Sequence, residues 1–267
     1  MPTDTEFLAG DVDFVGLAAS LVMVVVALIL SRWNRLGIEQ SIGVAVARAL
    51  VQLLGIGAVL AFILDPDRSL ALSWAWVVVM VFFAAVVLSR RAGEVPGLFP
   101  IGLAAFVAAA IVTLGVIFGL GIFPLEARAL VPLAGMMIGN SMNATVVVAR
   151  RVVEELRDKR DEVEARLALG HSSRRASLPY VRSAIRTALT PQVETTKGVG
   201  LVFLPGAMTG LILAGVDPVD AVKVQAAIMF LILGSVATTT TVVGFGAASR
   251  LFTPDHRLVA LERPAGT

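Results

Sequence analysis

The sequence predicts an all-α polytopic membrane protein, with about seven transmembrane helices forming a single transmembrane domain over residues 1–267. Two features of composition indicate this class. Hydrophobic residues occupy 57% of the 267 positions and charged residues only 16%, whereas a soluble domain is about a quarter charged. The third observation is clustering, because the apolar residues form runs of roughly 20, the length that crosses the hydrocarbon core of a bilayer.

Seven apolar segments follow one another along the chain, and turn signals separate them. The turns hold Pro, Gly and acidic residues, as at Asp65-Pro66-Asp67 and at Asp217-Pro218. Proline is favoured at the first position of a helix, so Pro218 is expected to begin the last span. The predicted spans are 12–31, 40–64, 70–89, 98–123, 129–149, 191–215 and 218–248.

Basic residues gather at one set of span ends and are scarce at the other. The rich ends carry Arg32, Arg35, Arg90 and Arg91, then ten basic residues from Arg150 to Arg186, and finally Arg250, Arg257 and Arg263. The other ends carry only Arg68, Arg128 and Lys223, mixed with acidic residues. The positive-inside rule therefore predicts an outside N-terminus and a cytoplasmic C-terminus in the plasma (inner) membrane, which an odd number of spans allows.

The same asymmetry explains the high pI of about 9.5 without a nucleic-acid partner. The chain is expected to be surrounded by membrane lipid. The N-terminal segment is acidic, with Asp4, Glu6, Asp11 and Asp13, and has no basic stretch before the first apolar run. A cleaved signal peptide is therefore not predicted.

A long charged cytoplasmic segment, residues 150–189, is predicted between spans five and six. Span five continues without Gly or Pro as far as Gly170, which is expected to end the helix in the C′ position. Glu155 with Lys159 and Glu162 with Arg166 have the favourable i,i+4 order for ion pairs. The apolar stripe of this predicted helical extension consists of Val152, Leu156, Val163 and Leu167.

A second amphipathic helix is predicted after Gly170. Its apolar face would hold Leu178, Val181, Ile185 and Leu189, with Arg175, Arg182 and Arg186 on the other side. Pro179 is expected in its first turn or at a break. Two interpretations stay open: the helix rests on anionic lipid, or it docks a cytoplasmic partner. The charged extension favours docking, because it would carry the loop away from the lipid.

Three blocks of sequence resemble the bacterial Fet-type iron-export ABC permease family, whose plant relatives are implicated in aluminium tolerance. They are GMMIGNSMNATVVVARRVVEE (135–155), ALGHSSRRASLPYVRSAIRTALTPQVE (168–194) and GVGLVFLPGAMTGLILAGVDPVDAVKVQ (198–225), and ARALVQLLGIGAVL (47–60) fits too. The resemblance covers roughly residues 40–250. It implies a permease that exports iron or another metal ion, works as a homodimer and pairs with a separate ABC ATPase subunit.

The cytoplasmic segment also resembles part of the ABC permease coupling motif. Glu164-Ala165 and Gly170 match the start of that motif, whereas its later Ile-x-Leu-Pro part is not matched. The candidate ATPase-coupling residues are Glu164, Gly170, Arg174, Arg175, Tyr180, Arg182 and Arg186. No GxxxxGK[ST] motif occurs in the chain, so ATP and Mg are expected on the partner, and this chain is expected to bind no cofactor and to have no catalytic residues.

Polar residues inside the predicted spans are candidates for the transport pathway, because such groups are costly in lipid and usually face a bundle interior. The candidates are Arg48, Gln52, Asn140, Met142, Asn143, Glu194, Lys197, Met208 and Gln225. Arg48 with Gln52 could equally be a structural pair that fixes helix packing, and Asn140 and Asn143 could simply bond neighbouring helices. Pro205 and Gly206 predict a kink in span six, and two GxxxG patterns, at Gly135 and at Gly206, predict close helix packing.

A resident metal site is not predicted. The chain has no Cys and two histidines, His171 and His256, both on the predicted cytoplasmic side, and proteins bind iron mainly through His, carboxylate or Cys. Two other functions stay open. One is a secondary transporter that uses Arg48, Glu194 or Lys197 as ion sites, and the other is a membrane scaffold whose loop binds a signalling partner.

Overall fold

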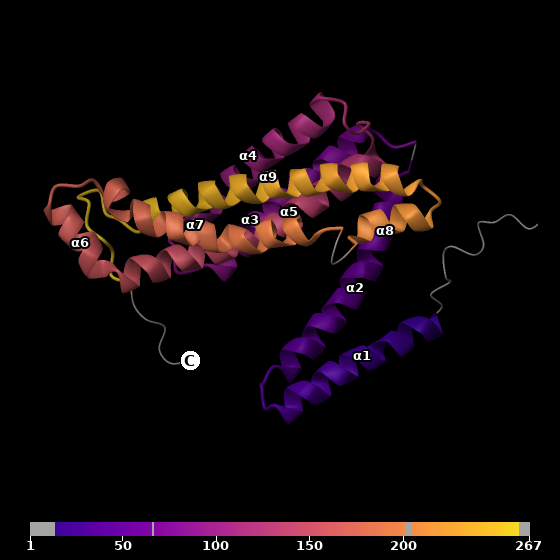
Figure 1. Cartoon of the computed structure of the whole chain (residues 1–267), viewed down its shortest axis with the longest axis horizontal. Helices are drawn as coiled ribbons and strands as arrows, with labels where there is room; N and C mark the ends of the chain where they lie inside the picture. Colours follow the sequence, from indigo (N-terminus) through magenta and orange to yellow (C-terminus); the bar gives the residue numbers. More distant parts are fainter. Residues whose placement is uncertain (1–13, 66, 201–203, 262–267) are drawn as a thin grey trace, which may run out of the picture. The chain divides into compact units, whose positions relative to one another are not determined.

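A computed structural model describes residues 14–65, 67–200 and 204–261, and in these ranges the regular secondary structure is helical (Figure 1). The predicted acidic N-terminal segment and Arg263 lie outside the described residues. The helices are α1 (Phe14–Trp33), α2 (Glu39–Ile63), α3 (Leu70–Arg91), α4 (Leu98–Gly119), α5 (Ala127–Asp158), α6 (Arg160–Ala168), α7 (Ser173–Gly198), α8 (Gly206–Leu213) and α9 (Pro218–Arg250).

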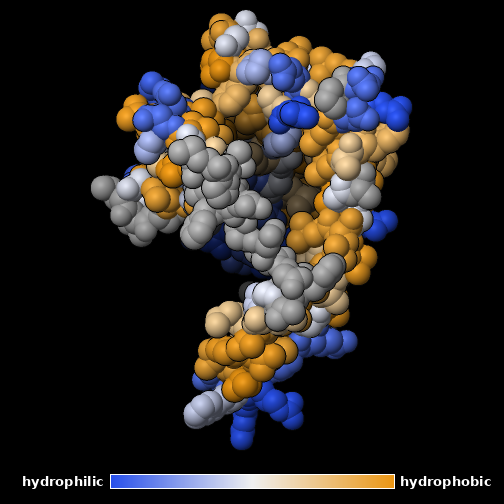
Figure 2. Space-filling view, turned by 90° about the vertical axis from the view of Figure 1, so that its right-hand side faces the viewer, coloured by the Kyte–Doolittle hydropathy of each residue, from blue (hydrophilic) through white to orange (hydrophobic). Residues whose placement is uncertain are grey.

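Five of these helices are long and apolar enough to cross a membrane, which confirms the multi-pass class. They are α2, α3, α4, α5 and α9, while the apolar part of α1, Ala18–Trp33, is shorter. Large apolar side chains are exposed on them, including Val78, Phe82 and Phe83 of α3, and Figure 2 shows broad hydrophobic areas on the face in view. Such a surface suits lipid. The count of seven spans stays a prediction.

The predicted sixth span, 191–215, is wrong as a single helix. Residues 191–198 instead end α7, which runs unbroken from Ser173 through Pro179 and Pro191. The backbone is extended at Val199, and Gly200 has a φ of +85°. α8 begins directly after Pro205, and the interruption already begins at Val199, before the predicted kink at Pro205 and Gly206. A left-handed glycine ends helices readily, which accounts for the break.

The predicted continuous helix from span five to Gly170 is also wrong in one respect. α5 stops at Asp158, Lys159 leaves helical geometry with a φ of −106° and a ψ of 25°, and α6 starts at Arg160. The change of direction lets the buried side chain of Val163 join the core that includes residues of α7. Tertiary packing of α6 against α7 has thus overridden the local preference for one straight helix.

The chain divides into two compact units. One contains α1, α2 and residues 209–218, and in it the Ser31 hydroxyl donates a 2.8 Å hydrogen bond to the Glu39 carboxylate across the α1–α2 turn. The other contains α3 to α7 and α9. There α5 lies beside α3, α4 and α7, and the core consists of buried Val, Leu, Ala and Met side chains from these helices and α9.

Helix α9 packs closely on its neighbours through glycines. A Cβ atom at Gly244 would lie 2.9 Å from Ile185 Cγ1 of α7 and 3.3 Å from Val148 Cγ2 of α5. A Cβ atom at Gly246 would collide with Ile101 Cγ2 of α4. These glycines lie outside any GxxxG pattern, and small residues at such crossings let helices in membranes approach each other.

We expect Gly246→Ala to lower the free energy of unfolding by about 1–3 kcal/mol, the usual cost of overpacking a core. The matched control is Gly135→Ala on α5, where a Cβ atom meets nothing within 4 Å. Alanine in a helix should leave the free energy of unfolding unchanged or raise it. Thermal unfolding in detergent measures both. Equal melting temperatures for the two variants would contradict the assigned α4–α9 contact. Ile101→Ala, which removes the clashing Cγ2 atom, should make Gly246→Ala less destabilising than it is in the parent protein.

Candidate functional site

Residues 150–189 form a helical hairpin, made of the end of α5, all of α6 and the first part of α7; we call it the α5–α7 hairpin (Figure 1). Its predicted apolar stripe is confirmed, since Val152, Leu156 and Val163 are fully buried and Leu167 packs on the same cluster. Ala176, Tyr180, Val181 and Ala184 of α7 are buried with them. The segment is therefore a packed element rather than an open loop.

Two carboxylates of the hairpin bind hydroxyl groups on α7. Glu155 accepts a hydrogen bond of 3.0 Å from Ser183 and pairs with Arg151 at 3.2 Å. Glu162 accepts 2.8 Å bonds from both Tyr180 and Lys159. The pairs predicted from sequence are therefore wrong. The break at Lys159 separates that residue from the helix of Glu155, and Glu162 binds Tyr180 and Lys159 instead of Arg166.

Glu162 makes the α6–α7 contact sensitive to pH. The Lys159 ammonium, and then the Tyr180 hydroxyl, hold the pKa of Glu162 below its usual value. A carboxyl with a depressed pKa stabilises the folded hairpin fully above its ordinary pKa of about 4.3, and that contribution is lost as the pH falls through the lower folded value.

We therefore expect spin labels on Asp161 and Arg175 to keep a narrow distance distribution from pH 7 down to about pH 4.3 and to broaden below it. Glu162→Gln should broaden the distribution already at pH 7, since an amide cannot replace the charged bond to Lys159. The control is Glu154→Gln, because Glu154 pairs with Arg151 on its own helix. If the distance distribution broadened neither at low pH nor in Glu162→Gln, the role of this contact would be contradicted.

Gly170 reverses the chain between α6 and α7. Its φ is +87°, its N–H donates to the Leu167 carbonyl at 2.9 Å, and the His171 N–H donates to the Arg166 carbonyl at 3.1 Å. These two bonds make a Schellman motif, in which a left-handed C′ glycine satisfies the last helical carbonyls. The predicted role of Gly170 as a helix terminator is confirmed. Ser172 then caps α7 by accepting from the Arg175 N–H.

Four arginines of α7 are exposed, namely Arg174, Arg175, Arg182 and Arg186. Among the described residues none of the four has an acidic partner, whereas Arg151, Arg157 and Arg160 of the same hairpin all form ion pairs. Glu164 is the partner of Arg160, at 2.6 Å. The hairpin thus neutralises much of its own charge and leaves these arginines available.

The predicted opposition of arginines and apolar residues on α7 is confirmed for three of the four apolar residues. Val181 is buried in the core and Ile185 and Leu189 pack against it, while the arginines are exposed. The two sides meet at one groove, which Ile185 and Leu189 line together with Arg182 and Arg186.

The asparagine cluster of α5 faces outward in this unit. Asn140 is exposed and donates a 2.8 Å bond to the Met136 carbonyl of its own helix. Asn143 is exposed and Met142 is half-buried. The polar contact that joins α5 to α9 is the buried 2.6 Å bond between the Ser141 and Ser235 hydroxyls, which nothing in the apolar sequence around Ser235 could reveal.

The two GxxxG patterns do not mark close packing among the described residues. A Cβ atom at Gly135 or Gly139 would meet nothing within 4 Å, and the same holds for Gly206 and Gly210.

The remaining pathway candidates are not brought to one place by any described contact. Arg48 and Gln52 are exposed on α2. Glu194 pairs with Lys197 at 2.8 Å, with side chains 60% and 66% exposed. Met208 and Gln225 are buried, and the Gln225 Oε1 atom has no hydrogen-bond partner among the described residues.

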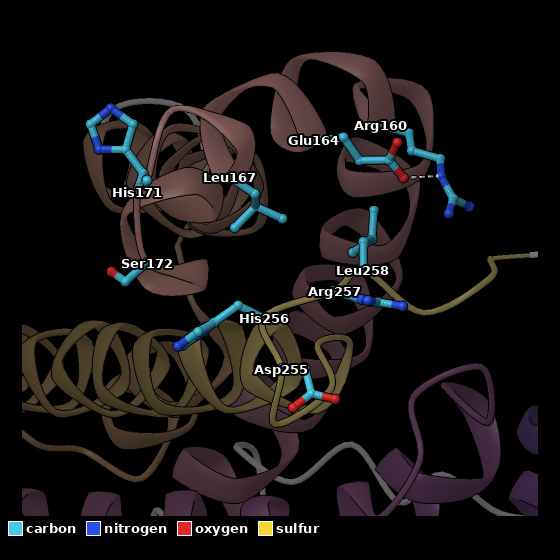
Figure 3. A pocket seen from close by; sticks show the side chains of 10 residues that line it. Arg160, Glu164, Leu167, His171, Ser172, Asp255, His256, Arg257 and Leu258 are labelled. Carbon is cyan, nitrogen blue, oxygen red and sulfur yellow. Dashed lines mark hydrogen bonds and ion pairs between the residues drawn. The ribbon is translucent and has the colours of Figure 1, made fainter.

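A cavity of about 690 Å³ lies between α6, the α6–α7 turn and the segment after α9, and both histidines line it (Figure 3). His256 Nδ1 lies 3.1 Å from Ser173 Oγ, while the His171 ring points away from the other labelled side chains (Figure 3). In the described ranges no group of three or more His, Cys, Asp or Glu side chains could hold a metal ion.

The segment after α9 was not foreseen as part of this site. Residues 251–259 fold back on themselves, with an antiparallel bridge between Phe252 and Leu258 and a hydrogen bond from the Val259 N–H to the Leu251 carbonyl. Leu251 and Leu258 are buried. The turn signal Thr253-Pro254-Asp255 could have predicted the fold-back but not its position against the α6–α7 turn.

Comparison with known proteins gives a consistent result. The model of an uncharacterised protein family, UPF0014, matches residues 14–252. The chain is 34% identical to the UPF0014 membrane protein YjkA of Bacillus subtilis over 92% of this chain and 98% of that protein. It is 33% identical to the protein ALUMINUM SENSITIVE 3 of Arabidopsis thaliana, over 90% and 88% of the two chains.

It is also 32% identical to the probable iron export permease protein FetB of Escherichia coli, over 92% of this chain and 95% of that one. No solved structure matches the chain. These relatives confirm the resemblance inferred from the three sequence blocks. The chain belongs to the UPF0014 family of membrane proteins, and a protein named as a probable iron export permease is among its relatives.

Proposed function

We propose that this chain is the membrane-spanning permease subunit of an ATP-driven ABC transporter that exports iron or another metal ion. The observation that carries the proposal is the α5–α7 hairpin: a rigid charged element that continues directly from the membrane-spanning helix α5 and leaves arginines unpaired. The name of the Escherichia coli relative, an iron export permease, supports the cargo.

The coupling surface in this proposal is the tip of the hairpin. It contains Glu164, Gly170, Arg174 and Arg175, with Tyr180 fixing α7 to α6 from inside. An acidic surface on a separate ATPase would bind these arginines. That subunit would supply ATP and Mg, because the sequence has no phosphate-binding loop of its own. Force would reach the membrane through α5, because the same helix runs from the hairpin to Asn140.

The transport path in this proposal runs beside the outward face of α5. Asn140 and Asn143 are exposed there, and an exposed amide is costly in lipid unless water or protein covers it. A second copy of the chain would complete such a path, giving a homodimer with two ATPase subunits. The proposed orientation has the N-terminus outside and the C-terminus and hairpin in the cytoplasm, at the plasma membrane.

Co-purification tests the pairing. The tagged permease, expressed with a candidate ABC ATPase, should retain that ATPase through detergent extraction, and the ATPase alone should not bind the resin. The complex should hydrolyse ATP faster when iron is added. Failure of every ATPase encoded by the source organism to bind the permease would overturn the proposal.

A further inference from the structure

The seam between α7 and α9 contains a groove of about 580 Å³ that the transport proposal does not use. Arg182 and Arg186 lie at one end of it. Its apolar lining comes from Ile185, Leu189, Val193 and Phe245. We propose that this groove binds an anionic phospholipid, with the phosphate on the two arginines and an acyl chain along the apolar floor.

The charge of the groove favours an anion at one end only. Arg182 and Arg186 are exposed and, within the described part of the chain, have no acidic partner. The one carboxylate that lines the groove, Glu194, lies at the opposite end and is paired with Lys197 at 2.8 Å. Two guanidinium groups side by side suit a phosphate, which they can bind through several hydrogen bonds.

The groove lies at the level where the neighbouring helices end in arginines. Ile185, Gly244 and Val148 lie at one level, because a Cβ atom on Gly244 would contact both of the others. On α5 that level is two residues, or about 3 Å, from Arg150. The Arg150 guanidinium in turn donates bonds of 2.6 and 2.9 Å to the Arg91 carbonyl at the end of α3.

Arg182 and Arg186 therefore lie near the arginine-rich boundary of the membrane-spanning helices, where phosphate headgroups are found. α7 runs antiparallel to α5, since Ser183 contacts Glu155 and Ile185 lies level with Val148. Leu189 and Val193 therefore lie about 6 Å and 12 Å beyond Ile185, alongside the apolar part of α5. The arginines at the boundary would face the charged headgroup of a phospholipid, and the apolar lining beyond them would face its acyl chain. A soluble anion would use the arginines but not the floor, and an acidic protein segment would have to enter the hydrocarbon layer.

Native mass spectrometry of the purified permease, without any ATPase, tests this inference. After incubation with equal amounts of phosphatidylglycerol and phosphatidylcholine, the protein should retain the anionic lipid preferentially. Arg182→Gln with Arg186→Gln should weaken that retention roughly thirtyfold, about fivefold for each arginine. Arg174→Gln with Arg175→Gln, which removes as much charge outside the groove, should change it less than about twofold.

Three further measurements distinguish the effect of charge from misfolding, and a bound lipid from a bound free phosphate. Arg182→Lys with Arg186→Lys should keep most of the retention, and melting temperatures should show that all variants are folded. Inorganic phosphate in large excess should not displace the lipid. Equal retention of both lipids, displacement by phosphate alone, or retention unchanged in Arg182→Gln with Arg186→Gln would each overturn the inference. Because no ATPase is present, these outcomes leave the transport proposal untouched.

Discussion

Reversing two charges at the tip of the hairpin, Arg174→Glu with Arg175→Glu, should abolish co-purification of the partner ATPase. Both side chains are exposed and, among the described residues, have no acidic partner, so an acidic partner surface would meet like charge. Like charges brought together at an interface cost several kcal/mol. A loss of affinity of at least about a hundredfold is therefore expected, measured by titrating labelled ATPase onto the permease in nanodiscs.

The matched control reverses the same number of charges at the opposite ends of the spans, Arg128→Glu with Lys223→Glu. These ends are predicted to lie outside, so ATPase affinity should change little. Both pairs are exposed, so melting temperatures should stay close to that of the parent protein. If the control weakened binding as much as Arg174→Glu with Arg175→Glu, the docking surface would not be at the hairpin.

The second large effect is expected at Gly170. A φ of +87° is strained for any residue with a Cβ atom and most of all for a β-branched one. Gly170→Val should therefore break the Schellman motif, displace the α6–α7 turn and lower substrate-stimulated ATP hydrolysis at least about tenfold. Space is not the cause, because a Cβ atom at this position would meet nothing within 4 Å.

Two comparisons isolate the backbone effect at Gly170. Ala168→Val adds the same side chain two residues earlier, at an exposed helical position of α6, and should leave coupling within about twofold. Gly170→Asn should be intermediate, because asparagine visits left-handed conformations more readily than valine does. If Gly170→Val and Ala168→Val coupled equally well, the reversal at Gly170 would have no part in transmission.

Local signals were enough to predict much of the fold. Continuous apolar runs located α2 to α5 and α9, Pro218 fixed the start of α9, and Gly170 ended α6. Each of these depends on residues close in sequence, where turn and cap geometry are decided. The buried apolar pairs were predictable for the same reason, since the helical period places Val152 with Leu156 on one face of α5 and Val163 with Leu167 on one face of α6.

The features that were not predictable depend on contacts between distant segments. Glu162 prefers the Tyr180 hydroxyl, 18 positions away, to the predicted Arg166. Gly246 gives no signal in sequence until Ile101 of α4 is placed against it. The groove beside Arg182 exists only because Phe245 of α9 forms its other side. The break at Lys159 likewise follows from packing of α6 on α7 rather than from local propensity.

The source of energy tests the central proposal most directly. Iron export should be followed in inverted membrane vesicles that contain the permease and its ATPase, with ATP supplied and the proton gradient collapsed by an ionophore. The ABC assignment predicts that accumulation continues, requires ATP and stops when the ATPase is omitted. Transport that ceases with the proton gradient and ignores ATP would contradict it and favour a secondary transporter using Arg48, Glu194 or Lys197.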